Sequence, residues 1–299
     1  MNIQRIALGT LPLLITLGCA STSINLPAVT ETPSGEQHQG RIIWHDLISD
    51  QPAASERFYS ELFGWEFEKV GDLFGLGADD GYSLIRHNGR LIGGMVNENR
   101  LPAAEEERSQ WVILMSVPDV DGATERLLAD GGTVLTPPTD IADRGRMAVV
   151  ADPQGALLAL LQAKGGDPEE FEPGYGDFLW DELWTGSVED ATTFYGSLVG
   201  YDLRDVPVQT DHDYRVLLSQ DQPRAGVLAH PFERERPVWV TYIRVQDPAA
   251  ITARVEALGG TVYLEAQDRP LGGRVALIAD PSGAGIALQT WPFDEEIAR

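Results

Sequence analysis

The chain has 299 residues, 43% of them hydrophobic and 23% charged, and a formal net charge of −24. This composition is typical of a folded globular protein of about two domains and excludes a disordered chain. A nucleic-acid partner is also excluded, because phosphate binding needs clustered Lys and Arg and this chain has no such cluster. The acidic excess is explained by a solvated surface; a preference for cationic ligands is the alternative reading.

Residues 1–19 form a segment of their own. One basic residue, Arg5, precedes the apolar run "IALGTLPLLITL", which ends at Gly18-Cys19. An apolar run of about a dozen residues suits a signal-peptide core, whereas a membrane span needs about 20. The segment is similar to a bacterial lipoprotein signal. That resemblance implies lipidation of Cys19 and attachment to the cell envelope, with the outer membrane slightly favoured; ordinary secretion with a free thiol is the alternative.

The next stretch, residues 20–40, is poor in large apolar side chains and rich in Ser, Thr, Pro and Gly. Such a composition predicts a flexible tether between the anchor and the folded part. The chain has a single cysteine, so no disulfide within the chain is expected.

From residue 41 onward the chain repeats itself. "WHDLISDQPAASERFYSELFGW" at 44–65 aligns without gaps to "WDELWTGSVEDATTFYGSLVGY" at 180–201, and "GGTV" and "ADPxGA" also occur twice. A repeat of this length predicts a tandem duplication. The expected division is a first domain at 41–163, a Pro/Gly/acid-rich linker at 164–176, a second domain at 177–292 and an acidic tail at 293–299.

Each domain contains a weaker half-repeat. In the first half, a strand at 41–48 leads to a helix at 52–63 that starts with Pro52, and short strands follow. The second half begins again with a strand, "WVILMSV", and a helix at 119–130 that stops before two glycines. The order strand–helix–three strands, four times over, predicts an α+β fold of four βαβββ modules.

This pattern resembles the vicinal oxygen chelate superfamily, which contains glyoxalase I, extradiol dioxygenases and bleomycin-resistance proteins. The residues that carry the resemblance are "FYSELFGW" and "FYGSLVGY", the "GGTV" turns, and the closing "DPQGALLAL" and "DPSGAGIAL". The resemblance implies concave mixed β-sheets that hold a small molecule, and it implies that the two domains pair within the chain.

Metal-using members of that superfamily place a His on the first strand of a module and a Glu on the last strand of its partner. The family spacing, fourteen positions before the Phe of the helix and four after the Gly of DPxG, gives Trp44, Ala159, Trp180 and Ala287. None of these side chains is a metal ligand. His45 is one residue away, which in a strand means the opposite face. We therefore expect no catalytic metal and no other cofactor; His45 with its repeat counterpart Asp181, as displaced ligands, is the alternative.

Strand alternation places Trp44 beside Asp46, and Trp180 beside Glu182, on one face of each sheet. An aromatic wall next to a carboxylate suits an apolar or aromatic small molecule that carries a polar or cationic group. Two further candidates are Arg146 and Arg274 in the repeated "GR" strands, either as ion-pair partners of these carboxylates or as contacts to an anionic part of a ligand.

The function that we expect is metal-free binding of a small molecule in the β-sheet pockets of an envelope-tethered protein. One alternative is an enzyme: a lyase or isomerase with Asp46 or Glu182 as general base, or a glyoxalase- or dioxygenase-type enzyme with displaced metal ligands. The other alternative is a protein-interaction scaffold whose sheet faces are filled.

Overall fold

The computed structural model describes residues 26–70, 81–101, 109–205, 214–232, 236–269 and 272–290. The predicted signal segment 1–19, the lipidation candidate Cys19 and the acidic tail 293–299 lie outside these residues. Among the helices that the structure describes, none is long and apolar enough to cross a membrane.

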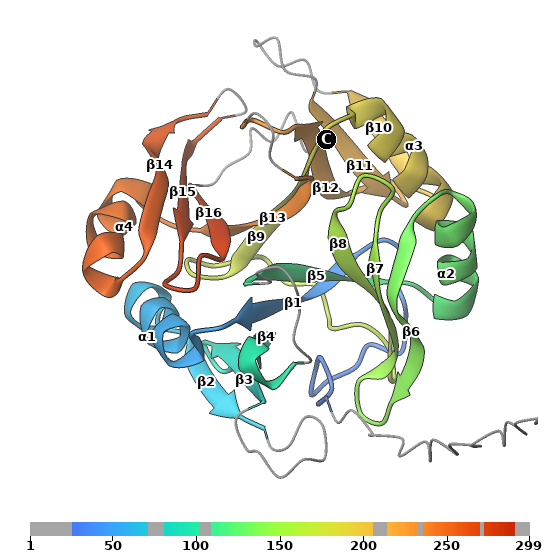
Figure 1. Cartoon of the computed structure of the whole chain (residues 1–299), viewed down its shortest axis with the longest axis horizontal. Helices are drawn as coiled ribbons and strands as arrows, with labels where there is room; N and C mark the ends of the chain where they lie inside the picture. The colour runs from blue at the N-terminus through green and yellow to red at the C-terminus, as the bar shows by residue number, and fades with distance from the viewer. Residues whose placement is uncertain are drawn as a thin grey trace, which may run out of the picture.

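Two eight-stranded mixed sheets make up the molecule, one from each half of the chain (Figure 1). The first sheet has the strand order β2-β3-β4-β1-β5-β8-β7-β6, and the second repeats it as β10-β11-β12-β9-β13-β16-β15-β14. Each sheet is built from two βαβββ modules whose first strands, β1 with β5 and β9 with β13, pair antiparallel at its centre. The predicted α+β fold of four modules is confirmed.

The elements of the first domain are β1 (Ile42–Ser49), α1 (Pro52–Phe63), β2 (Glu66–Lys69), β3 (Tyr82–His87), β4 (Arg90–Asn97), a 3₁₀ turn (Glu98–Arg100), β5 (Gln110–Ser116), α2 (Val120–Ala129), β6 (Thr133–Ile141), β7 (Gly145–Ala151) and β8 (Leu157–Ala163). Those of the second are β9 (Phe178–Thr185), α3 (Val188–Val199), β10 (Asp202–Asp205), β11 (Tyr214–Ser219), β12 (Gln222–Ala229), β13 (Val238–Arg244), α4 (Pro248–Val255), a 3₁₀ turn (Glu256–Leu258), β14 (Thr261–Asp268), β15 (Arg274–Ala279) and β16 (Gly285–Gln289).

The helix boundaries follow from local chemistry. Pro52 begins α1, where its missing N–H costs nothing, and Gly64 ends the helix in the left-handed region at φ 74°. In the second domain the Ser187 side chain accepts from the Asp190 N–H at the start of α3, and Gly200 at φ 71° ends the helix. The repeated "FY…G" segments therefore form equivalent helices.

The two domains pack through the faces that carry the helices. Helix α1 lies beside α4, and α2 beside α3, so that residues of both domains share each core (Figure 1). One core joins Leu47 and Phe58 to Ile243 and Ile278, and the other joins residues of β5 and β8 to those of α3. The opposite faces of the two sheets, which we call the concave faces, consequently point away from each other.

Residues 26–40, expected to be part of a flexible tether, instead pack against the first domain. Leu26 and Val29 are only 6% and 2% exposed, and both belong to the apolar cluster on the concave face of this domain. The short apolar run "LPAV" in an otherwise polar segment explains this difference, because it buries its side chains against the sheet. Only residues 20–25 of the expected tether lie outside the part of the chain that the structure describes.

Candidate ligand sites on the concave sheet faces

On the concave face of the first domain, Trp44 and Asp46 are joined by a buried polar cluster. The Trp44 indole donates to Asp46 Oδ1 at 2.8 Å, and the Tyr82 hydroxyl donates to the same oxygen at 2.7 Å. Arg144 donates to the Tyr82 hydroxyl at 2.9 Å and lies 3.8 Å from Asp46 Oδ2. Burial, with a smaller contribution from the Asp46 carboxylate, keeps the pKa of Tyr82 raised, so the phenol stays protonated.

Arg144 also ties this cluster to the N-terminal segment. Its side chain is fully buried, and its Nε donates to the Pro27 carbonyl at 2.6 Å. The guanidinium lies over the rings of Trp44 and Tyr82, 5.0 and 5.6 Å from their centroids. The concave face of the first domain is therefore covered at this cluster by the chain itself.

In the second domain the equivalent carboxylate, Glu182, is fully buried and fully engaged. Tyr214 donates to its Oε1 at 2.8 Å and Arg269 donates to the same oxygen. Its Oε2 accepts from Tyr242 at 2.5 Å and from Trp184 at 3.4 Å. A carboxylate has about four acceptor positions, so these four donors leave none for a ligand or a substrate proton. Glu182 therefore orients the side chains that donate to it and does not act as a general base.

The second cluster also contains Arg269 and Gln289, whose amide has one buried N–H group that no described residue accepts from. Burial alone lowers the pKa of Arg269, but the adjacent Glu182 carboxylate more than offsets this and raises it, so the guanidinium is always charged. Arg269 Nη1 also donates to Gln289 Oε1 at 2.6 Å, which fixes the orientation of that amide. Gln289 is fully buried, and its Nε2 makes no hydrogen bond within the described residues. A buried N–H group without a partner costs free energy unless an acceptor meets it.

The arginines that meet the carboxylates are not the two that the sequence suggested. Arg146 turns outward to Asp121 at 2.5 Å and Asp140 at 2.8 Å, and Arg274 lies near Asp247 at 3.4 Å. Arg146 lies on β7 and faces the start of α2, and Arg274 lies on β15 and faces the start of α4. The cluster arginines come from the preceding hairpin turns instead.

Sequence reasoning missed Arg144, Arg269, Tyr82, Tyr214 and Gln289. A signal for four of them was present in the repeat: an Asp-Arg pair precedes each "GR" strand, at 143–144 and 268–269, and a tyrosine opens the third strand of modules one and three. Gln289 has no counterpart in the first domain, where the matching residue is Leu161.

The positions that the family spacing assigns to metal ligands lie in one row on each concave face. Trp44 is the strand partner of Leu114, which is in turn the partner of Ala159; Trp180, Tyr242 and Ala287 form the equivalent row. These side chains offer no metal ligand, and the described residues hold no group of three His, Cys, Asp or Glu that suits an ion. The donor set does not fit a divalent cation.

His45 lies on the other face, between the domains. Its Nε2 is 3.0 and 3.1 Å from the two carboxylate oxygens of Asp181, and the Thr241 hydroxyl donates to Asp181 at 2.7 Å. The ring also packs on Phe178 with centroids 4.1 Å apart. The His45–Asp181 pair therefore joins the equivalent strands β1 and β9 across the domain interface.

Comparisons with known proteins agree with this architecture. Residues 19–160 match the family model described as the Glyoxalase/Bleomycin resistance protein/Dioxygenase superfamily, and residues 181–288 match the glyoxalase-like domain. The Mycobacterium tuberculosis protein named "Putative glyoxylase CFP32" is 32% identical over 250 residues, which cover 83% of this chain and 94% of that protein. The Streptomyces protein named "Anthracycline biosynthesis protein DauV" is 31% identical, covering 83% of this chain and 92% of its own.

Among solved structures, the Mn(II)-bound glyoxalase from Novosphingobium aromaticivorans superimposes with a TM-score of 0.55 at 16% identity, over 85% of this chain and 82% of that one. This likeness concerns the fold alone. The chain belongs to the glyoxalase/bleomycin resistance protein/dioxygenase superfamily as a tandem of two glyoxalase-like domains.

Proposed function

We propose that the protein binds a small aromatic or apolar molecule on the concave face of the second domain. The observation that carries this proposal is the difference between the two concave faces. In the first domain the chain supplies its own occupant, Leu26 to Val29, with a backbone carbonyl on Arg144. In the second domain the apolar clusters on this face consist of strand residues alone, within the described part of the chain.

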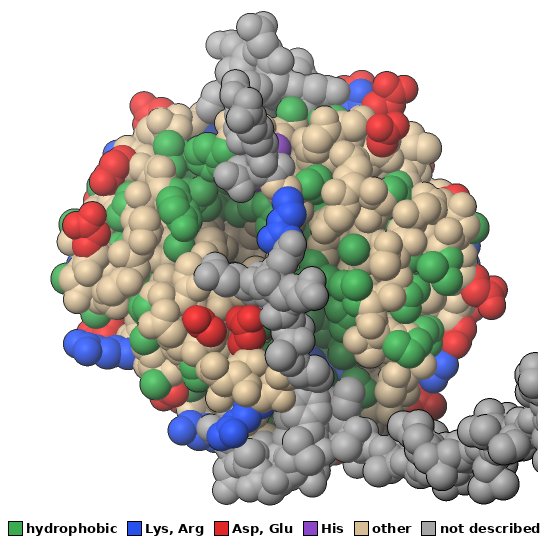
Figure 2. Space-filling model, viewed as in Figure 1, with side chains coloured by type: hydrophobic (Ala, Val, Ile, Leu, Met, Phe, Trp, Pro, Cys, Tyr) green, Lys and Arg blue, Asp and Glu red, His purple; other side chains and the backbone are tan. Residues whose placement is uncertain are grey.

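The shape of the surface agrees with this choice. Figure 2 shows a hollow in the upper half of the molecule, with apolar side chains along its walls, above the second sheet as Figure 1 places it. Trp180 and Leu228 are only partly buried there, next to the buried Tyr214 and Trp184. Partly exposed aromatic surface beside a few buried polar groups is the usual composition of a small-molecule site.

The chemistry of the polar groups defines the ligand class. Glu182 is saturated by its four donors, so it attracts no cation here, contrary to what the sequence suggested. Gln289 Nε2 is a donor, and the positive charge of Arg269 lies beside it. Together they favour a ligand with an acceptor oxygen: a carbonyl, a carboxylate or a phenolate. The function is therefore binding of an oxygen-bearing aromatic or apolar molecule, with no step that uses Glu182 as a base.

The N-terminal sequence supports a location of the protein close to the envelope membrane. If Cys19 is lipidated, only residues 20–25 separate the lipid from Leu26, which is fixed on the first domain. Six or seven extended residues reach about 25 Å at most. The protein is then held close to the envelope membrane with its first domain nearest the bilayer, rather than on a long tether.

The test uses the full chain and two probes on one ring system, 2-naphthoate and 2-naphthylmethylammonium, with affinity measured by isothermal titration calorimetry. We expect naphthoate to bind, and Gln289→Leu to weaken it about fivefold or more, as loss of one hydrogen bond to a charged group does. Leu is the residue that the first domain has at this position. Equal naphthoate affinity in wild type, Gln289→Leu and the control Gln162→Leu would overturn the proposal.

A further inference from the structure

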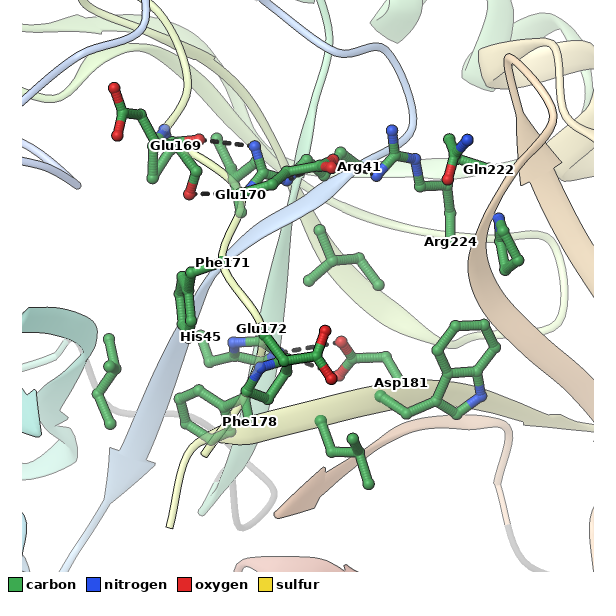
Figure 3. A pocket seen from close by; sticks show the side chains of 18 of the residues that line it. Arg41, His45, Glu169, Glu170, Phe171, Glu172, Phe178, Asp181, Gln222 and Arg224 are labelled. Atoms are coloured by element: carbon green, nitrogen blue, oxygen red, sulfur yellow. Dashed lines mark hydrogen bonds and ion pairs between the residues drawn. The ribbon is translucent and has the colours of Figure 1, made fainter. Parts of the chain in front are cut away.

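A pocket of about 500 Å³ lies between the two domains, beside the first residues of β1 and β9 and the linker that follows the first domain (Figure 3). It exists because β1 pairs with β4 only from Asp46 onward, and β9 with β12 only from Glu182 onward. The starts of β1 and β9 therefore diverge from their neighbours and leave a gap in each sheet. The linker segment 168–173 runs along both gaps and forms the rim.

The walls of this pocket are mainly apolar and aromatic. Phe171 of the linker, Phe178 and Trp180 of β9, and the aliphatic Ile43 and Ile92 of the first domain line it. Phe171 is 45% exposed, and the Arg90 guanidinium lies over its ring, 3.8 Å from the centroid. A volume of this size with such walls falls in the range of small-molecule sites.

The positive charges of the pocket are already engaged. Arg224 contacts Glu170 at 2.5 Å, and Arg41 lies 3.5 Å from the same carboxylate. Arg41 also donates to the carbonyls of Pro168 and Glu169, at 2.6 and 3.2 Å. Both guanidinium groups therefore serve to hold the linker in place.

The negative charges are in excess. Asp181 is paired with His45, and Glu170 with the two arginines. Glu169 and Glu172 also line the pocket, and Figure 3 shows the Glu172 carboxylate beside Asp181 and the Glu169 carboxylate directed away from the pocket. Both residues are exposed and form no ion pair with any residue that the structure describes. Aromatic faces beside unpaired carboxylates attract a cation with an apolar body, through cation–π and charge interactions together.

We propose that this interdomain pocket is a second small-molecule site, and that it takes an organic cation with an aromatic or apolar body. The cationic group lies at the acidic rim, nearest to the Glu172 carboxylate, and the apolar body lies against Phe171 and Phe178 (Figure 3). Residues of both domains and of the linker form the site, so it exists only in the tandem chain. A cationic ligand is the kind that the sequence suggested for Glu182, whose acceptor positions are already filled.

The probe is benzyltrimethylammonium, a permanent cation that donates no N–H, titrated into the full chain by calorimetry with benzyl alcohol as the neutral comparison. We expect saturable binding of the cation that weakens as salt is raised, and much weaker binding of the alcohol. The double variant Glu169→Gln/Glu172→Gln should lose roughly fivefold or more in affinity, the sum of two exposed charge contributions.

Two controls separate this site from the other. The exposed pair Glu66→Gln/Glu125→Gln removes the same charge elsewhere and should leave the affinity unchanged. Gln289→Leu should weaken naphthoate only, so failure of one site does not decide the other. Equal binding of the alcohol and the cation, no binding of the cation, or an unchanged affinity in the Glu169→Gln/Glu172→Gln variant would overturn the interdomain site.

Discussion

The Nε of Arg144 donates to the carbonyl oxygen of Pro27 at 2.6 Å, joining two residues that are 117 positions apart in the chain. This bond makes the segment after the predicted signal an integral part of the first domain. It also explains why two domains with the same fold have different concave faces. In the first domain Arg144 donates to a backbone carbonyl of the same chain. In the second domain Arg269 donates to Gln289, whose amide N–H is unpaired.

Replacing Arg144 by Met should destabilise the fold strongly. The change leaves Asp46 buried without its cation and the Pro27 carbonyl without its donor, which typically costs about 3–5 kcal/mol. Urea unfolding of the full chain measures this difference. Arg146→Met changes a half-buried arginine two positions later whose ion-pair partners are exposed; it is the matched control and should have a much smaller effect. Similar losses in both variants would contradict the role given to Arg144.

Val29→Asp should release the N-terminal segment from the first domain. Val29 is 2% exposed in an apolar cluster, so a carboxylate there is buried without a partner. Limited proteolysis should then cut within residues 26–40 much faster than in wild type. Thr32→Asp, at an exposed position of the same segment, should leave the cutting rate unchanged. Slow cutting in both variants would mean that the segment is held by other contacts.

Asp152 in the first DPxG turn makes the free energy of unfolding depend on pH. Burial raises its pKa above the usual 3.8, so the folded chain holds this proton more tightly than the unfolded chain. The resulting stability is fully present below the unfolded pKa and is lost as the pH rises through the folded pKa. Asp152→Asn does not titrate, and its amide can still serve the turn and Tyr195.

The unfolding free energy of Asp152→Asn relative to wild type should therefore increase as the pH rises from about 3.8 to the raised folded value, and then level off. Urea unfolding across this range measures it. Asp202→Asn, an exposed aspartate on β10, should show no such trend. A difference for Asp152→Asn that stays constant with pH would be inconsistent with the raised pKa.

Metal retention tests whether the chain binds a metal ion although Trp44, Ala159, Trp180 and Ala287 stand at the expected ligand positions. The full chain, incubated with Zn, Ni, Mn and Fe and then desalted, should keep far less than one ion per chain by elemental analysis, because Trp and Ala offer no ligand. Near-stoichiometric metal that disappears in His45→Ala would instead assign His45 and Asp181 as displaced ligands.

The fold was readable from the sequence because the repeat supplies the same strand and helix signals four times. The sequence also predicted which side chain of β1 lies on the concave face: the strand pairing to Leu114 and Ala159 puts Trp44 and not His45 there. Period-two alternation is a local property, and the sequence displays it directly.

The partners of Asp46 and Glu182 were harder to predict, because they come from hairpin turns and from other strands. Arg144 and Arg269 reach the carboxylates through the conformation of a turn, which alternation along a strand does not describe. The packing of Leu26 and Val29 on the first domain is likewise a long-range event. A short apolar run in a polar segment indicates burial but does not name the surface that covers it.

The most direct test of the central claim is a crystallographic screen of the full chain with small aromatic carboxylates and carbonyl compounds. The account predicts bound fragments on the concave face of the second domain, with an oxygen within hydrogen-bond distance of Gln289 Nε2. It predicts none between Trp44 and Arg144. Fragments that displace Leu26 to Val29 from the first domain while the second concave face stays empty would contradict it.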